Sequence, residues 1–249
     1  MRKAIVLPVL ALLAVAYPAA ASAGAFKGVV VAKDKGRHAL VLASQTGTVH
    51  TIRTQRMGIR VGARLAVRAR ARSDGTFRAT RLARHGQADH ACVRAVVVRR
   101  LHRRLLVSAG HSVLSIRLRN AHSTRGLPSG SEPRRGDIVD VSVTISKRGE
   151  LEEDEINEIG HVDKIELEGT VVSVTPSTAS QPGSLTIRVG GLSFDVVVPP
   201  GFDVSGLKPG DRVEVEATVS GSTLTLAEVD QEDQGDDGGG DDGGGGGDD

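Results

Sequence analysis

Apolar and polar residues alternate along most of the chain, and this pattern predicts short strands joined by turns. The clearest case is 210–219, where Val213 and Val215 are separated by acidic residues. A two-residue period is typical of a strand with one buried face. The Ser-Gly pair at 220–221 favours a turn, so 223–226 is expected to form the second strand of a hairpin.

The same plan occurs three times in the chain. Each copy begins with an apolar strand and ends with a hairpin, and Phe77, Leu151 and Leu224 fall at equivalent places. A repeat of about 70 residues is too long for most solenoids, so each copy is expected to be a small barrel. We therefore predict an all-β fold of three tandem, five-stranded barrels that pack on one another. The predicted modules span 26–84, 91–159 and 165–229.

The motifs in these modules resemble an uncharacterised family, domain of unknown function 5666. The third module matches best, through Leu167-Glu168-Gly169 and Pro209-Gly210-Asp211. The second module has Ala95 in place of the opening glycine, and the first has Val61-Gly62-Ala63, which lacks the Asp. The resemblance implies OB-like β-barrels, often in tandem, in exported bacterial proteins. It implies no active site.

The two ends of the chain differ from the modules. Residues 1–23 combine Arg2 and Lys3 with a short apolar run and Ala21-Ser22-Ala23, which is typical of a cleaved signal peptide. We therefore expect a protein secreted to the extracellular space, periplasm or cell envelope, without a transmembrane segment in the mature chain; an uncleaved anchor is the alternative. Residues 231–249 contain only Asp, Glu, Gln and Gly, so a disordered acidic tail is expected.

Composition limits the chemistry. Aromatic residues make up 2% of the chain, and Cys92 is its single cysteine, so no intramolecular disulfide can form. The sequence has no Gly-x-Ser-x-Gly elbow, phosphate-binding loop or His-Glu-x-x-His motif. We expect a protein that is not an enzyme and needs no cofactor.

Charge divides the chain into two halves. Residues 26–148 hold 26 Lys and Arg against 6 Asp and Glu, a net charge of +20. Residues 149–249 hold 4 Lys and Arg against 24 Asp and Glu, a net charge of −20. The basic half could be neutralised by the acidic half of the same chain, or it could bind an external polyanion.

The candidate polyanion-binding residues lie at alternate positions of two predicted strands. If Val67 and Ala69 face the core, the arginines beside them line the outer face. The candidates are Arg68, Arg70, Arg72, Arg117 and Arg119. Since no aromatic residues are interleaved with them to stack on bases, sequence-specific nucleic-acid binding is not expected.

A second candidate site lies in the predicted linker between the first two modules. His85, Asp89, His90 and Cys92 are all possible metal ligands within eight residues. Their spacing matches no known metal motif, and a small core residue is the alternative role for Cys92.

These patterns predict a non-catalytic secreted or envelope-associated binding module. Its basic half would engage acidic polymers or an acidic protein. The alternative is a structural protein that self-associates electrostatically through its oppositely charged halves. A secreted hydrolase is the third class considered.

Overall fold

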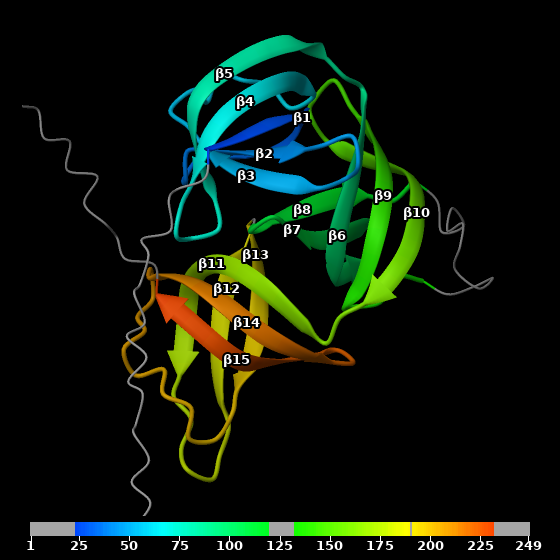
Figure 1. The fold of residues 1–249 in the computed structure, drawn as a ribbon. Coiled ribbons are helices and arrows are strands. Elements are labelled where there is room, and N and C mark those ends of the chain that lie inside the picture. Colours follow the sequence, from blue (N-terminus) through cyan, green and yellow to red (C-terminus); the bar gives the residue numbers. More distant parts are fainter. Residues whose placement is uncertain (1–22, 120–131, 190, 232–249) are drawn as a thin grey trace, which may run out of the picture.

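A computed structural model describes residues 23–119, 132–189 and 191–231 of the chain. Within these ranges every regular element is a β-strand (Figure 1). No helix in the described part is long and apolar enough to cross a membrane. The predicted signal peptide, apart from Ala23, and the predicted tail, apart from Gln231, lie outside these residues.

Fifteen strands form three closed barrels of five strands each. Barrel 1 contains β1 (Ala23–Asp34), β2 (Ala39–Ala43), β3 (Val49–Arg53), β4 (Ala63–Ala71) and β5 (Phe77–Gln87). Barrel 2 contains β6 (His90–Leu101), β7 (Arg104–Ala109), β8 (Ser112–Arg117), β9 (Asp137–Ile145) and β10 (Leu151–His161). Barrel 3 contains β11 (Lys164–Thr175), β12 (Gly183–Val189), β13 (Leu192–Val198), β14 (Arg212–Ser220) and β15 (Thr223–Gln231).

The three barrels share one topology. In barrel 1 the strand order is β1-β2-β3-β5-β4, and β4 pairs with β1 to close the sheet. The third and fifth strands of each barrel pair in parallel, and the remaining pairs are antiparallel. This is the arrangement of the five-stranded OB-fold barrel. The predicted all-β, OB-like fold is therefore confirmed.

Two boundaries differ from those predicted. Strand β5 continues to Gln87 and β6 begins at His90, so most of the stretch predicted as a linker is strand. Backbone pairing of Gln87 with Ala63 extends the hairpin beyond the apolar pattern. Strand β15 ends at Gln231, because this residue still pairs with Val213 although it belongs to the acidic composition of the predicted tail.

A bulge in the first strand of each barrel turns one extra side chain outward. The strand register shifts at Val31, Val98 and Val172. In barrels 1 and 2 this places two consecutive buried valines on opposite sides of the sheet. The outer one, Val31 or Val98, belongs to an apolar cluster shared with the next barrel.

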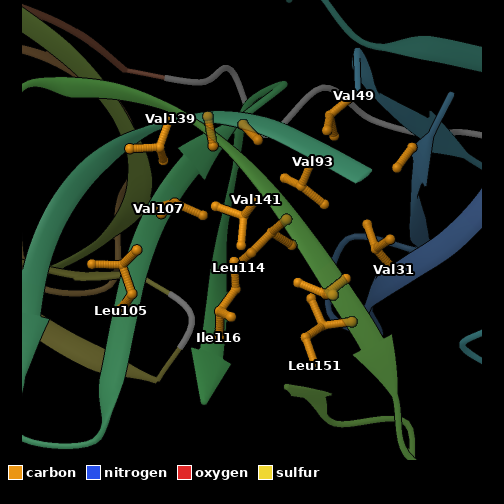
Figure 2. Close-up of a cluster of buried hydrophobic side chains, with 14 of the residues drawn as sticks. Val31, Val49, Val93, Leu105, Val107, Leu114, Ile116, Val139, Val141 and Leu151 are labelled. Carbon is orange, nitrogen blue, oxygen red and sulfur yellow. The ribbon is translucent and has the colours of Figure 1, made fainter. Parts of the chain in front are cut away.

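The barrels stack through these outer apolar residues. The outer face of β2 and β3 contributes Val41 and Val49 to the cluster around Val93 and Val141 of barrel 2 (Figure 2). Strand β6 lies against this face, and β11 lies against β7 and β8 in the same way. In barrel 3 most of the equivalent outer positions are polar, and Val197 is an exposed apolar residue on the same face. The polar positions include Thr186, Arg188, Ser193 and Asp195.

Barrel 3 also contacts barrel 1, so the three barrels meet at one junction. Arg37 Nη1 lies 2.6 Å from Glu168 Oε1, and the two side chains are only 12% and 5% exposed. Arg212 donates a hydrogen bond of 3.2 Å from Nη2 to the carbonyl oxygen of Gly36. The turn between β7 and β8 enters this junction, where Thr51 Oγ1 donates to the carbonyl oxygen of Gly110.

Candidate functional site

Four exposed arginines form a compact patch on the outer surface of β4 and β5. Arg68 and Arg70 point outward because the alternating residues of β4, such as Val67, are buried in barrel 1. In the antiparallel pairing with β5, Arg68 lies opposite Arg81 and Arg70 lies opposite Arg78. We call this patch, Arg68, Arg70, Arg78 and Arg81, the arginine face.

A bulge in β5 places Arg81 in the arginine face. The register shifts between Arg68 and Ala69, so Thr80 is skipped and Arg81 lies across from Arg68. Thr80 Oγ1 donates a hydrogen bond of 3.0 Å to the carbonyl oxygen of Arg68. Strict alternation would place Thr80 at that position. The sequence interpretation missed Arg78 and Arg81. Pairing the two strands of the hairpin outward from the Ser73-Asp74-Gly75 turn could have placed Arg78 opposite Arg70, but it would not have found Arg81.

The positive charges of the arginine face are not balanced by neighbouring carboxylates. Within the described ranges, none of its four side chains forms an ion pair with a carboxylate. Like charges directly opposite each other on neighbouring strands are destabilising. An external anion bound between these guanidinium groups would relieve the repulsion.

The other predicted polyanion-binding arginines have different surroundings. Arg72 Nε lies 3.2 Å from Asp74 Oδ2 at the end of the β4–β5 hairpin. Burial alone would raise the pKa of Asp74, but hydrogen bonds from Thr76 and the charge of Arg72 outweigh it and lower that pKa. Arg72 is therefore balanced by a carboxylate at the edge of the face.

Arg117 and Arg119 lie on barrel 2 and do not join the arginine face. Arg117 is exposed at the end of β8. Arg119 lies 3.2 Å from Glu152 Oε2 and 2.9 Å from Asp154 Oδ1. Here the acidic residues of β10 neutralise an arginine of the same barrel, as the intramolecular alternative predicted.

A cleft of about 980 Å³ lies between barrels 1 and 2 beside the arginine face. Its barrel 1 wall includes Lys27 and Arg64, both exposed. Arg64 precedes Arg68 at alternate outward positions of β4, so the positive surface continues from the arginine face to the rim of the cleft.

The predicted metal ligands are distributed around this cleft. His85, His90 and Cys92 line it, whereas Asp89 lies in the turn between β5 and β6. His90 Nδ1 lies 3.4 Å from Asp154 Oδ2, and Cys92 Sγ lies 3.8 Å from Ser142 Oγ. The structure therefore brings His90 Nε2 within 3.9 Å of Asp89 Oδ2 but gives Cys92 a separate polar neighbour.

A different group of possible metal ligands does converge. In the described part of the chain, His111, Glu166 and Glu214 are the set whose ligand atoms all lie within 4.8 Å of one another. They lie at the junction of the barrels. The sequence interpretation missed this set, because barrel stacking and not sequence spacing brings the residues together.

The surface that usually binds ligands in OB-folds is covered in barrel 1. That surface comprises the second and third strands with the loops that join strands 1–2 and 4–5. In barrel 1 the first of these loops contacts barrel 3 through Arg37, and the second lies against His111 at Gly75. Because β2 and β3 face barrel 2, the arginine face is a different surface, formed by β4 and β5.

Solved structures that match the chain share little sequence with it. Drosophila Unr CSD456 is 13% identical, with 85% of this chain and 98% of that chain covered and a TM-score of 0.22. The p204 HINb domain is 12% identical, with 55% and 93% covered and a TM-score of 0.24. A multidomain protein with nucleic acid binding domains from Streptococcus pneumoniae TIGR4 is 14% identical, with 81% and 72% covered and a TM-score of 0.21.

The OB-like assignment rests on the strand order of the three barrels. A comparison with curated protein sequences found no match. One family model matches part of the chain, from the middle of β10 through β15. Residues 154–229, which include all of barrel 3 except the last two residues of β15, match the family described as "Domain of unknown function (DUF5666)".

Proposed function

We propose that this protein is a non-catalytic binding module that engages anionic polymers through the arginine face of barrel 1. The observation that carries the proposal is the in-register pairing of Arg68 with Arg81 and of Arg70 with Arg78, with no carboxylate paired to them among the described residues. Guanidinium groups suit phosphate, sulfate and carboxylate groups because each can donate two parallel hydrogen bonds.

The spacing of the arginine face favours a polymer over a single small anion. Outward residues two apart on a strand are separated by about 6.8 Å, and neighbouring strands by about 4.8 Å. Four guanidinium groups on this grid present a row of positive charge, which Arg64 and Lys27 extend toward the cleft. A chain with regularly spaced anionic groups can contact several of them at once.

Recognition is expected to depend on charge and not on bases. The aromatic side chains of barrel 1, Phe26 and Phe77, pack with each other at 4.6 Å and with His50. Burial lowers the pKa of His50, so this ring adds no positive charge to barrel 1 at neutral pH. With no aromatic residue in the arginine face, bases have no platform on which to stack.

The acidic half is partly engaged within the chain, which supports binding over self-association. Glu168 pairs with Arg37, and Lys164 Nζ lies 2.6 Å from Glu216 Oε1. These carboxylates are less available to a second molecule than the sequence suggested. The signal-peptide pattern of residues 1–23 supports a secreted or envelope-associated setting for the binding.

Heparin affinity chromatography tests the proposal. The wild-type protein should be retained at low salt, and the variant R68A/R70A/R78A/R81A should elute much earlier. For a DNA duplex as the polyanion, the slope of log K against log salt should decrease by about 3–4, because each lost phosphate contact releases roughly 0.9 fewer counterions.

A charge-matched control separates the arginine face from net charge. The variant R103A/R104A/R117A/R148A removes four exposed arginines from barrel 2 and its β9–β10 turn. It should keep most of the wild-type retention. Equal loss in the two variants, or no retention of the wild-type protein at low salt, would overturn the proposal.

A further inference from the structure

We propose that His111, Glu166 and Glu214 bind one divalent transition-metal ion of the Zn²⁺ type at the junction of the three barrels. One ligand atom from each side chain lies within 4.8 Å of the others. The residues come from three elements: the turn between β7 and β8, strand β11 and strand β14. The site therefore joins barrel 2 to barrel 3.

Four carboxylates on barrel 3 form an acidic block that a cation would stabilise. The block consists of Glu166, Glu168, Glu214 and Glu216. Glu166 pairs in register with Glu216, and Glu168 with Glu214, on the same outward face of β11 and β14. Like charges this close repel each other unless cations lie between them. Positive charge beside the block therefore stabilises it.

Lys and Arg side chains lie beside two carboxylates of this block. Arg37 and Arg53 lie 2.6 Å and 3.7 Å from Glu168, and Lys164 pairs with Glu216. On the Glu166–Glu214 diagonal, the described residues provide no Lys or Arg ion pair for Glu166. The ring of His111, which is charged only when protonated, lies beside Glu214.

The fold holds the His111 ring toward the two carboxylates. Gly110 and His111 form a two-residue turn in which both have positive φ, 55° and 63°, the backbone of a tight hairpin. His111 Nδ1 lies 3.4 Å from Glu214 Oε1. On the other side, a Cβ atom at Gly75 would lie 2.4 Å from His111 Nε2, so the β4–β5 turn of barrel 1 confines the ring.

The ligand types select the kind of metal. One imidazole and two carboxylates suit Zn²⁺ with three protein ligands and a water, whereas Ca²⁺ and Mg²⁺ prefer oxygen ligands alone. Zn–N and Zn–O bonds are about 2.0–2.2 Å, so the three groups need to close by a small amount around the ion. Such an ion would neutralise the acidic diagonal and hold the β7–β8 turn against barrel 3.

Zinc titration of the full chain, followed by calorimetry and thermal unfolding, tests this site. We expect one saturable Zn²⁺ ion and a rise in Tm of roughly 5–10 °C at about a hundred times the dissociation constant. H111A and E166Q should each weaken binding by about tenfold or more, since each removes a ligand. Excess Mg²⁺ should not compete.

Matched variants locate the ion. E158Q changes an exposed carboxylate of β10 in barrel 2, which pairs with Val139 and not with the acidic block, and should bind Zn²⁺ as the wild type does. The variant H85A/H90A/C92A removes the ligands that line the cleft and should also keep the site. Loss of binding in that variant, a cysteine-to-metal charge-transfer band with Co²⁺, or no saturable Zn²⁺ binding by the wild type would each overturn the proposal.

Discussion

At the scale of single residues, Glu153 is the carboxylic acid that the fold places under the greatest burial. It is 2% exposed and accepts a hydrogen bond of 3.1 Å from the backbone N–H of Arg119. Burial raises its pKa, and the nearby Asp154 adds to this, while that hydrogen bond and the arginines oppose it. The folded protein therefore holds the Glu153 proton more tightly than the unfolded chain.

This difference makes a pH prediction for E153Q. Below the unfolded pKa of about 4.3, Glu153 is protonated in both states and costs the fold nothing. As pH rises through the higher folded pKa, the wild type must bury a charge and loses stability. A glutamine stays neutral, so E153Q should gain in Tm over the wild type between pH 4 and pH 7.

The measurement is thermal unfolding of both proteins across this pH range. E228Q, which changes an exposed carboxylate, should track the wild type at every pH. A Tm difference between E153Q and the wild type that shrinks toward pH 7 would contradict the assigned direction of the pKa shift.

Residues of one strand were easier to predict than residues that meet across the fold. The outward positions of Arg68 and Arg70 followed from the alternation of β4 alone. The position of Arg81 depends on the bulge at Thr80, which has no signal in the apolar pattern. The group around His111 depends on barrel stacking, which no local pattern encodes.

At the scale of elements, the opening glycine of barrels 1 and 3 has a physical reason. A Cβ atom at Gly28 would lie 2.2 Å from the carbonyl oxygen of Ala43, and one at Gly169 would lie 2.8 Å from that of Arg188. Backbone cannot move aside as a flexible side chain can. Ala95 fills the equivalent place in barrel 2, so that barrel has adjusted to a methyl group.

Exchanging these residues should have unequal effects. Gly28→Ala should destabilise the protein by about 1–3 kcal/mol, because the methyl group overpacks the contact between β1 and β2. Ala95→Gly should cost less, since it removes one methyl group and causes no clash. Chemical denaturation of both variants gives the comparison; a Gly28→Ala variant as stable as the wild type would show that β2 can move away.

The strand plan itself was readable from sequence because most strands alternate and most turns carry Gly, Asp or Ser. Exceptions are β2, which is buried throughout, and the His102-Arg103 turn between β6 and β7. The module ends were not, since β5 and β15 extend through polar residues that are held by backbone pairing. Ladder hydrogen bonds do not depend on side-chain type, so they can continue where the apolar pattern stops.

At the scale of the whole molecule, the pair between Arg37 and Glu168 fastens the first barrel to the third. Glu168→Ala would remove the most buried carboxylate beside Arg37 and Arg53, which keep Asp34 at 3.8 Å and Asp74 at 3.5 Å. Breaking an isolated buried pair costs about 3–5 kcal/mol, so we expect a smaller loss here. We expect a lower Tm and faster proteolysis at the β1–β2 turn. The exposed Glu228→Ala is the matched control, and an unchanged Tm in Glu168→Ala would mean that barrels 1 and 3 do not depend on this pair.

The outer face of β12 and β13 in barrel 3 differs from the matching faces of barrels 1 and 2. Barrels 1 and 2 each offer the next barrel an apolar surface, whereas Thr186, Arg188, Ser193 and Asp195 occupy that surface on barrel 3. A fourth barrel added there would have to dehydrate these groups without replacing their hydrogen bonds. Another protein surface would therefore pack on this face less favourably than barrel 2 packs on barrel 1, so one strand plan yields faces that accept a neighbour and a face that favours water.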